Sequence, residues 1–207
     1  MDPQWLQWAK ELQAIAQIGL TYSSTSHFDV ERYNRIREIA AEILASSGDV
    51  GSDEVLEVLQ REEGYATPKV DVRGVVFRDD EILLVRETSD GRWTLPGGWA
   101  DVNQTARDAV AREVFEESGY RVAPSKLLAV FDRSRHEHTP SFPFHVYKIF
   151  ILCRLIGGEP KTSYETSAVE FFGEDALPEL STSRVTVAQI RRMFEHLRQP
   201  DLPTDFD

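Results

Sequence analysis

The chain has 207 residues, of which 41% are hydrophobic and 28% charged, and its 35 acidic against 23 basic side chains give a formal net charge of −12. This composition predicts a globular protein with one main domain and a smaller one. The acidity and the lack of a basic run argue against duplex nucleic acid as a partner. The single cysteine, Cys153, excludes an internal disulfide or a Cys-based zinc site. Without a leader or an 18-residue apolar run, we expect a cytoplasmic protein that is not membrane-bound.

Residues 1–63 are predicted to form a small all-helical domain, because apolar residues recur there at three- and four-residue spacing. These residues are Trp5, Trp8, Leu12 and Ile15 in the first segment, and Tyr33, Ile36, Ile39 and Ile43 in the second. Asp29 is expected to cap the second helix, residues 47–49 to end it and Ser52 to cap a third. Residues 64–69 are predicted to be a linker. We expect the helices to form a homodimer interface anchored by their tryptophans, or to contribute to the substrate pocket.

From residue 70 the sequence changes to short β-branched and apolar runs, which predict strands. Residues 70–77 and 82–85 are expected to form a hairpin, and further strands to follow at 93–95, 127–131, 146–155 and 169–172. Helices are predicted at 106–118 and 185–198. The first of these helices has Thr105 placed to cap it and Gly119 placed to end it. Residues 70–207 are therefore predicted to be a second domain, of the α+β or α/β class.

Three carboxylates are predicted to share one face of the helix at 106–118. Glu113, Glu116 and Glu117 stand at offsets of zero, three and four residues. A solvated acidic face is the usual explanation for such a cluster. Against it, Glu113 and Glu117 repel each other by roughly 0.2 to 0.5 kcal/mol, and acidic residues in a last turn oppose the helix dipole. A divalent cation would offset both effects, and oxygen ligands without His or Cys favour Mg²⁺ or Mn²⁺.

The segment before this helix completes a longer motif. Paired glycines at 97 and 98 are followed by five residues and then Gln104. After a further seven residues comes the run Arg112-Glu113-Val114-Phe115-Glu116-Glu117-Ser118-Gly119-Tyr120. This motif resembles the box that defines the Nudix family. It departs from the family pattern at Gln104, which stands in place of a glutamate, and at Tyr120, which replaces an aliphatic residue. The neutral Gln104 leaves the metal count and the orientation of Arg112 open.

The resemblance extends over 70–180 and implies a Nudix α/β/α sandwich with a mixed sheet, preceded by the small helical domain. The helical front half and the runs at 70–73 and 95–101 look like the subgroup that contains CDP-choline pyrophosphatase. Proteins described as ADP-ribose pyrophosphatases look alike in these segments. The best-fitting function is thus Mg²⁺-dependent cleavage of a pyrophosphate bond in a CDP-choline-like substrate. An ADP-ribose hydrolase and an inactive ligand-sensing module are the alternatives.

The resemblance also assigns roles within the box. Glu116 and Glu117 are implied to be the principal metal ligands, and Glu113 to be a ligand or to orient a metal-bound water. Arg112 is implied to steady a carboxylate. The backbone of Gly97 is expected to add an oxygen ligand, and Gly98 to contact the substrate.

Four further residues are expected near the substrate, each with a plainer alternative. Glu165, in a polar loop before a strand, is the candidate general base, or else a surface glutamate. Arg73 would contact a phosphate or form a salt bridge. His138 belongs to a His-Glu-His run at 136–138 that would border the substrate pocket or, less plausibly, bind a metal. Trp99 would stack on a base or pack in the core.

Overall fold

The computed structural model describes residues 2–22, 26–46 and 50–207, so the expected helix break at 47–49 lies outside the described residues. The chain divides into two compact units. The first comprises Met1–Pro68 together with Phe142–His145, and the second comprises Lys69–Ser141 with Val146–Asp207. A short segment from the second half of the sequence therefore belongs to the N-terminal unit.

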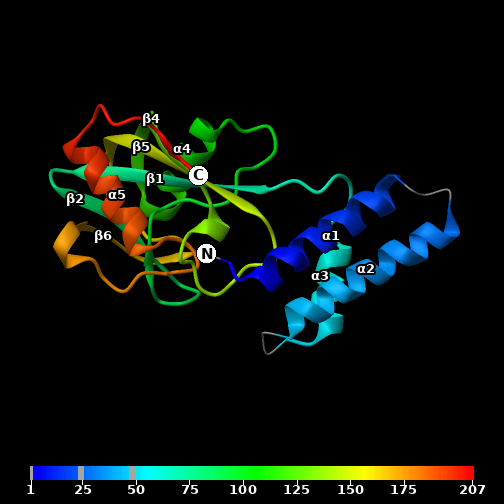
Figure 1. The fold of residues 1–207 in the computed structure, drawn as a ribbon. Coiled ribbons are helices and arrows are strands. Elements are labelled where there is room, and N and C mark those ends of the chain that lie inside the picture. Colours follow the sequence, from blue (N-terminus) through cyan, green and yellow to red (C-terminus); the bar gives the residue numbers. More distant parts are fainter. Residues whose placement is uncertain (1, 23–25, 47–49) are drawn as a thin grey trace. The chain divides into compact units, whose positions relative to one another are not determined.

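The N-terminal unit contains the three expected helices, α1 (Gln4–Tyr22), α2 (His27–Ala45) and α3 (Ser52–Gln60), shown in blue to cyan in Figure 1. They pack around Ala40, Ala41 and Leu59, against which Phe144 also packs. The core is small, and one of its large side chains comes from a segment 80 residues further along the sequence. The unit is thus incomplete without Phe142–His145.

Two of the expected helix caps are wrong. Ser26 is the N-cap of α2, and its side chain accepts a hydrogen bond from the amide of Asp29, which lies inside the helix. Ser52 is already the first residue of α3, and Gly51 occupies the N-cap position without a side-chain bond. A residue can cap a helix only from the N-cap position, just before the first turn, where the backbone amides have no partner within the helix. Asp29 and Ser52 both lie inside their helices and therefore cannot be the caps.

The second unit is built on a mixed sheet. Its strands are β1 (Lys69–Arg78), β2 (Glu81–Glu87), β3 (Trp93–Thr94), β4 (Tyr120–Asp132), β5 (Val146–Gly158), β6 (Thr166–Gly173) and β7 (Asp205–Phe206). Their order is β3-β2-β1-β5-β4-β7, and β6 pairs with β2. The β1–β5 and β4–β7 pairs are parallel and the others are antiparallel. Two short 3₁₀ helices, η1 (Arg133–Arg135) and η2 (Glu174–Ala176), complete the unit with the α-helices below.

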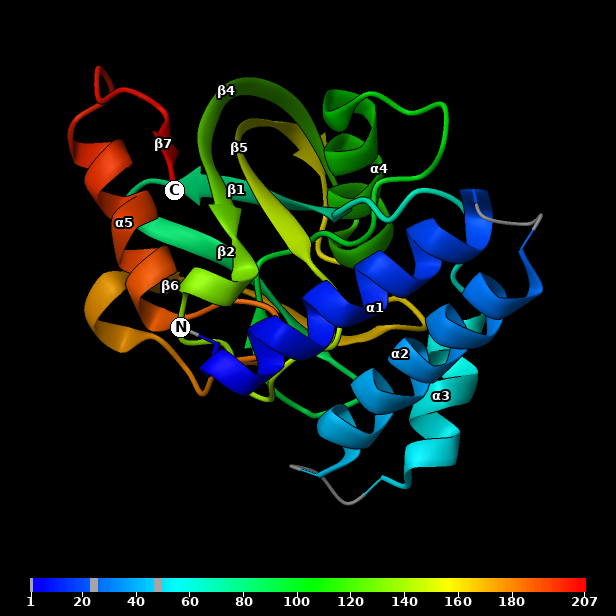
Figure 2. The same ribbon diagram turned by 45° about the vertical axis from the view of Figure 1, so that its right-hand side comes forward.

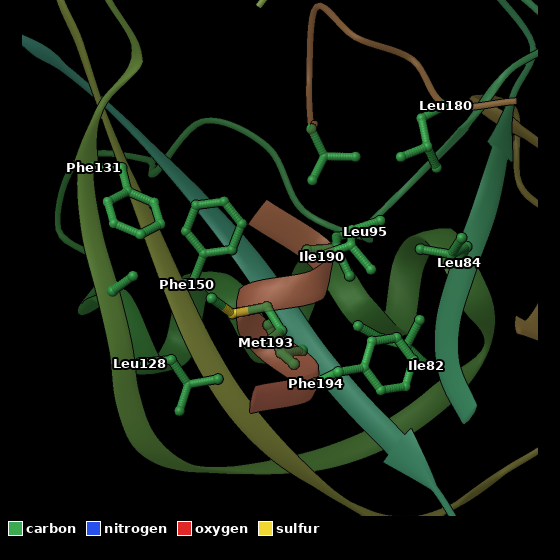
Figure 3. Packing of buried hydrophobic residues seen from close by; sticks show 13 residues of the cluster. Ile82, Leu84, Leu95, Leu128, Phe131, Phe150, Leu180, Ile190, Met193 and Phe194 are labelled. Carbon is green, nitrogen blue, oxygen red and sulfur yellow. The ribbon is translucent and has the colours of Figure 1, made fainter. Parts of the chain in front are cut away.

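Helices cover both faces of this sheet (Figure 2): α4 (Ala106–Ser118) on one and α5 (Val187–Arg198) on the other. Successive residues of β1 point to opposite faces, so Val75 packs in the cluster that contains α5, and Val76 in the one that contains α4. Figure 3 shows the α5 side, where Ile190, Met193 and Phe194 belong to the same buried cluster as Phe150 of β5. The predicted α/β/α sandwich with a mixed sheet, preceded by helices, is confirmed.

The observed and predicted element boundaries differ most at β4. The strand begins at Tyr120, directly after α4, seven residues before the predicted strand at 127–131. Its register against β5 shifts at three places, so side chains do not alternate regularly and the period of two is lost. By contrast, the helix predicted at 185–198 is α5, which begins two residues later because Thr186 forms a capping box with Gln189.

Cys153 is buried, and burial raises the pKa of its thiol to about 12. A buried thiol of this kind is unreactive, as its position in an apolar run indicates.

Across the part of the chain that the structure describes, every helix is too short or too polar to cross a bilayer.

Candidate active site

The glycine-rich loop after β3 lies along β1 like an additional strand. The amides of Val72 and Gly74 donate to the carbonyls of Gly98 and Pro96, both at 2.8 Å. Gly97 between them has φ of 143°, and a Cβ built there would lie 2.0 Å from the carbonyl oxygen of Val72. Only glycine fits this position, and the loop is therefore held at a fixed place beside the strand.

Helix α4 is fixed at both ends and packs closely on β1. Thr105 caps its first turn, and Gly119, at φ of 75°, ends it in the left-handed conformation. A Cβ on Gly74 would lie 2.3 Å from a methyl group of Val114, so the absence of a side chain at Gly74 lets the helix approach the strand. This packing brings the C-terminal turns of α4 to the glycine-rich loop.

Two of the three predicted carboxylates meet that loop. The amide of Gly97 donates to Oε2 of Glu117 at 2.8 Å, and the Glu113 carboxylate lies against Gly98, where an added Cβ would be 3.1 Å from Oε2. Glu113 is 9% exposed and Glu117 5%. Burial raises the pKa of Glu117 to about 8 and also raises the pKa of Glu113, because a carboxylate loses hydration there.

The third carboxylate, Glu116, is exposed and faces the guanidinium of Arg112. Nη1 of Arg112 donates to Oε2 of Glu116 at 2.7 Å, and Nη2 lies 2.9 Å from Oε1 of Glu113. Arg112 thus contacts two of the box carboxylates.

The chemistry of this site fits a hard divalent cation. Glu113 and Glu117 are both buried and supply carboxylate oxygens, the ligand type that such cations prefer. Among the described residues, however, no three His, Cys, Asp or Glu side chains lie close enough to hold a metal ion. Glu116 would have to turn from Arg112 to become a third ligand.

Arg73 belongs to a buried ion network. Of its two expected roles, contact with a phosphate or a salt bridge, the structure shows the salt bridge. Arg73 and Asp71 are two residues apart on β1 and share one face, and the guanidinium makes two bonds to the carboxylate, at 2.8 and 2.6 Å. Nζ of Lys148 donates to the same carboxylate at 2.8 Å. Nη1 of Arg73 donates to the carbonyl of Leu95 at 3.1 Å. The network therefore ties β1 and β5 to the start of the glycine-rich loop.

Glu87 is a buried carboxylate near the site that the sequence did not single out. It ends β2 opposite Thr166 of β6, whose hydroxyl donates to the carbonyl of Glu117 at 2.7 Å. Arg184 lies 3.0 Å from Oε1 of Glu87. Burial foremost raises the pKa of this carboxyl as well. Glu87 is placed here because β2 pairs with β6. The local sequence at residues 82–87, Ile-Leu-Leu-Val-Arg-Glu, does not predict this pairing.

The remaining expected residues differ in their exposure and in their hydrogen-bond partners. Glu165 is exposed in the turn before β6, and its carbonyl accepts from the amide of Thr88. Trp99 follows the loop and is about half exposed. His138 is buried, with Nδ1 3.0 Å from the carbonyl of Thr182 and Nε2 3.2 Å from the Gln189 amide nitrogen. Burial foremost lowers its pKa to about 3, and these bonds give it structural partners away from the α4 carboxylates.

Gly97→Ala is expected to destabilise the protein strongly and to abolish activity. The new Cβ meets only backbone atoms of β1, which cannot move as a side chain can, and the displaced loop loses its bond to Glu117. Urea unfolding followed by circular dichroism would measure the loss. Gly51→Ala is the matched control, because Gly51 has ordinary backbone angles and open space around it. Equal stability of the two variants would contradict the fixed loop.

Comparison with known proteins gives the class of this chain. Residues 67–194 match the NUDIX domain, and residues 3–59 match the UDP-X-like, N-terminal oligomerisation domain. The first match alone covers more than half of the chain. The protein belongs to the Nudix family and is a Nudix hydrolase, as its box indicates.

Two of the relatives span both the helical and the Nudix parts of the chain, and a third covers about two thirds of it. The putative ADP-ribose pyrophosphatase YjhB of Bacillus subtilis (strain 168) is 45% identical over 207 residues, 100% of this chain and 99% of that protein. A crystal structure of a UDP-X diphosphatase is 33% identical, with a TM-score of 0.64 over 98% of both chains. That of an ADP-ribose pyrophosphatase from Streptococcus suis 89-1591 is 44% identical, with a TM-score of 0.62 over 68% of this chain and 100% of that one.

Proposed function

We propose that this Nudix hydrolase uses Mg²⁺, or Mn²⁺ in its place, to cleave the pyrophosphate bond of a nucleoside diphosphate linked to a second group. The observation that carries the proposal is the pairing of two buried carboxylates, Glu113 and Glu117, against the Gly97–Gly98 loop. Burying two like charges is unfavourable unless a cation compensates them. Nudix hydrolases in general use divalent metal ions, which supports that explanation.

The chain's residues would divide the work as follows. Glu113, Glu116 and Glu117, with a backbone oxygen of Gly97, would hold the metal, which supplies positive charge to the diphosphate oxygens. Because the chain carries a net charge of −12, a diphosphate anion would otherwise be repelled. Gly98 and Trp99 adjoin the carboxylates and would contact the substrate.

The substrate proposal places ADP-ribose ahead of CDP-choline. The sequence favoured a CDP-choline-like compound, but two of the relatives reported above are named for ADP-ribose pyrophosphatase activity. A third is named for UDP-X. All three names describe a nucleoside diphosphate joined to another moiety, which is the class that we propose here.

The test is a panel of ADP-ribose, CDP-choline and UDP-linked sugars, each incubated with Mg²⁺ and with EDTA, and analysed for nucleoside monophosphate. We expect release of the monophosphate from at least one compound and none with EDTA. If no compound is cleaved but one binds in calorimetry, the chain is a ligand-sensing module instead.

Glu165→Gln is expected to lower kcat by about a hundredfold, the lower end for loss of a general base, with little change in stability. Glu165 is exposed and its backbone is held by Ser163 and Thr88, so the substitution disturbs no packing. Glu170→Gln, at an exposed position of β6, provides a control for surface charge. Steady-state kinetics would decide the role, because a plain surface glutamate predicts equal kcat for the two variants.

We also propose that the N-terminal unit forms a homodimer. Trp8, Ile15 and Tyr22 are exposed and recur every seven residues on α1, so they lie on one side of the helix. The matched domain is described as an oligomerisation domain. Light scattering on wild type and Trp8→Glu would test this, with a dimer and a monomer as the expected masses.

A further inference from the structure

The box of this chain lacks its first glutamate, yet Arg112 is not without a carboxylate on that side. The neutral Gln104 presents Oε1 to Nε and Nη2 of Arg112, at 3.4 Å in both cases. Oδ2 of Asp101 accepts from Nη2 at the shorter distance of 3.0 Å. The residue three positions before the substituted one therefore provides the charged contact.

A tight turn makes this exchange possible. The amide of Gln104 donates to the carbonyl of Asp101 at 3.2 Å, which closes a four-residue turn. Asn103 within the turn has φ of 67°, a conformation that asparagine tolerates. As a result, the Asp101 carboxylate and the Gln104 amide both reach the Arg112 guanidinium.

We infer that Asp101 is a positioning residue that takes the place of the missing box glutamate. It holds Arg112, and through Arg112 it positions Glu113 and Glu116. The inference rests on the proposed metal role of these two glutamates. A cation bound at Glu113 would repel the Arg112 guanidinium, so a carboxylate that is not itself a metal ligand is needed to keep Arg112 in place. Without Asp101, Arg112 would bind Glu116 more persistently and compete with the metal.

The test uses Mn²⁺ binding to the substrate-free enzyme, measured by calorimetry. Asp101→Asn is expected to weaken binding about fivefold, the effect of losing one exposed ion pair. Adding Gln104→Glu to this variant should restore affinity to within about twofold of wild type. Asp80→Asn, in the β1–β2 turn, removes the same charge elsewhere and should leave binding unchanged.

A second background separates positioning from charge acting through space. If Asp101 acts through Arg112, Asp101→Asn should have no further effect on Mn²⁺ affinity in an Arg112→Gln protein. A full fivefold loss in that background, or failure of Gln104→Glu to restore binding, would overturn the inference.

The pairing is also tested without metal, so that its failure is distinct from failure of the proposed function. In EDTA, the shifts in Tm caused by Asp101→Asn and Arg112→Gln should be non-additive, because the two residues share one ion pair. Additive shifts would overturn the inference even if Mn²⁺ binds. If wild-type protein binds no Mn²⁺ but the two Tm shifts are non-additive, the metal role of the box is refuted. The pairing of Asp101 with Arg112 is not.

Discussion

Glu117→Gln is expected to lower turnover more than about a hundredfold, the upper end for loss of a residue that only supports a metal ligand. The same substitution should stabilise the metal-free protein at neutral pH. Glutamine is neutral at every pH and can still accept the hydrogen bond from the amide of Gly97, so it keeps the contact and avoids the cost of burying or protonating a carboxylate. A variant that is more stable than wild type but inactive would show that the Glu117 carboxylate is needed for activity at a cost in stability.

The stability effect has a defined pH dependence. The pKa of Glu117 is raised from 4.5 to about 8 in the folded protein, foremost by burial. The proton is therefore bound more tightly in the folded state, and the stability that this gives is complete below pH 4.5 and lost as the pH rises to about 8. The loss by neutral pH is on the order of 3 kcal/mol. Urea unfolding in EDTA at pH 5 and pH 8 should show this loss in wild type and a much smaller one in Glu117→Gln.

Glu116→Gln provides the matched control. Glu116 is exposed and pairs with Arg112, so its replacement leaves the buried Glu117 carboxylate in place, and the loss of stability between pH 5 and pH 8 should be as in wild type. Turnover should nevertheless fall by orders of magnitude, because both carboxylates are proposed metal ligands. Wild-type turnover in Glu117→Gln would refute its role as a ligand.

Asp71→Asn is expected to destabilise the protein by about 3 to 5 kcal/mol, the range for removing one partner of a buried ion pair. Asp71 accepts bonds from Arg73 and Lys148, all three residues being buried. Although burial alone would raise its pKa, the two cations lower it to about 2. Its contribution to stability is therefore present above about pH 3.8 and lost as the pH falls towards 2.

The substitution leaves two buried cations without their counter-charge. Adding Lys148→Met should recover part of the loss, since one of these cations is then gone. Asp80→Asn, at an exposed turn position, is the control. Urea unfolding at pH 7 would compare the four proteins, and an Asp71→Asn protein within about 1 kcal/mol of wild type would contradict the role of the network.

Helix α4 was predictable from sequence to the residue because its signals are local. Thr105 caps it and Gly119 ends it, as the spacing predicts, and the structure confirms both bounds. The placement of Glu113 and Glu117 on one face follows from the helical period alone. The proximity of the glycine-rich loop to these carboxylates came from the resemblance to the Nudix box, and the bond from Gly97 to Glu117 now gives it a physical basis.

The features that the sequence did not reveal depend on contacts between distant segments. Lys148 meets Asp71 because β1 and β5 pair in parallel across 77 residues. Glu87 is buried by pairing of β2 with β6, and Phe144 packs with helices that precede it by 80 residues or more. A single polar or aromatic residue in an unremarkable local pattern does not indicate such partners.

The most direct test of the account is calorimetric titration of the EDTA-stripped enzyme with Mg²⁺ at pH 7, in two buffers of different ionisation enthalpy. Because the pKa of Glu117 is about 8 without metal, binding to its carboxylate should release a proton to the buffer, and Glu117→Gln should lose both the binding and the release. No saturable binding by wild type, or binding by Glu117→Gln with the same proton release, would contradict it.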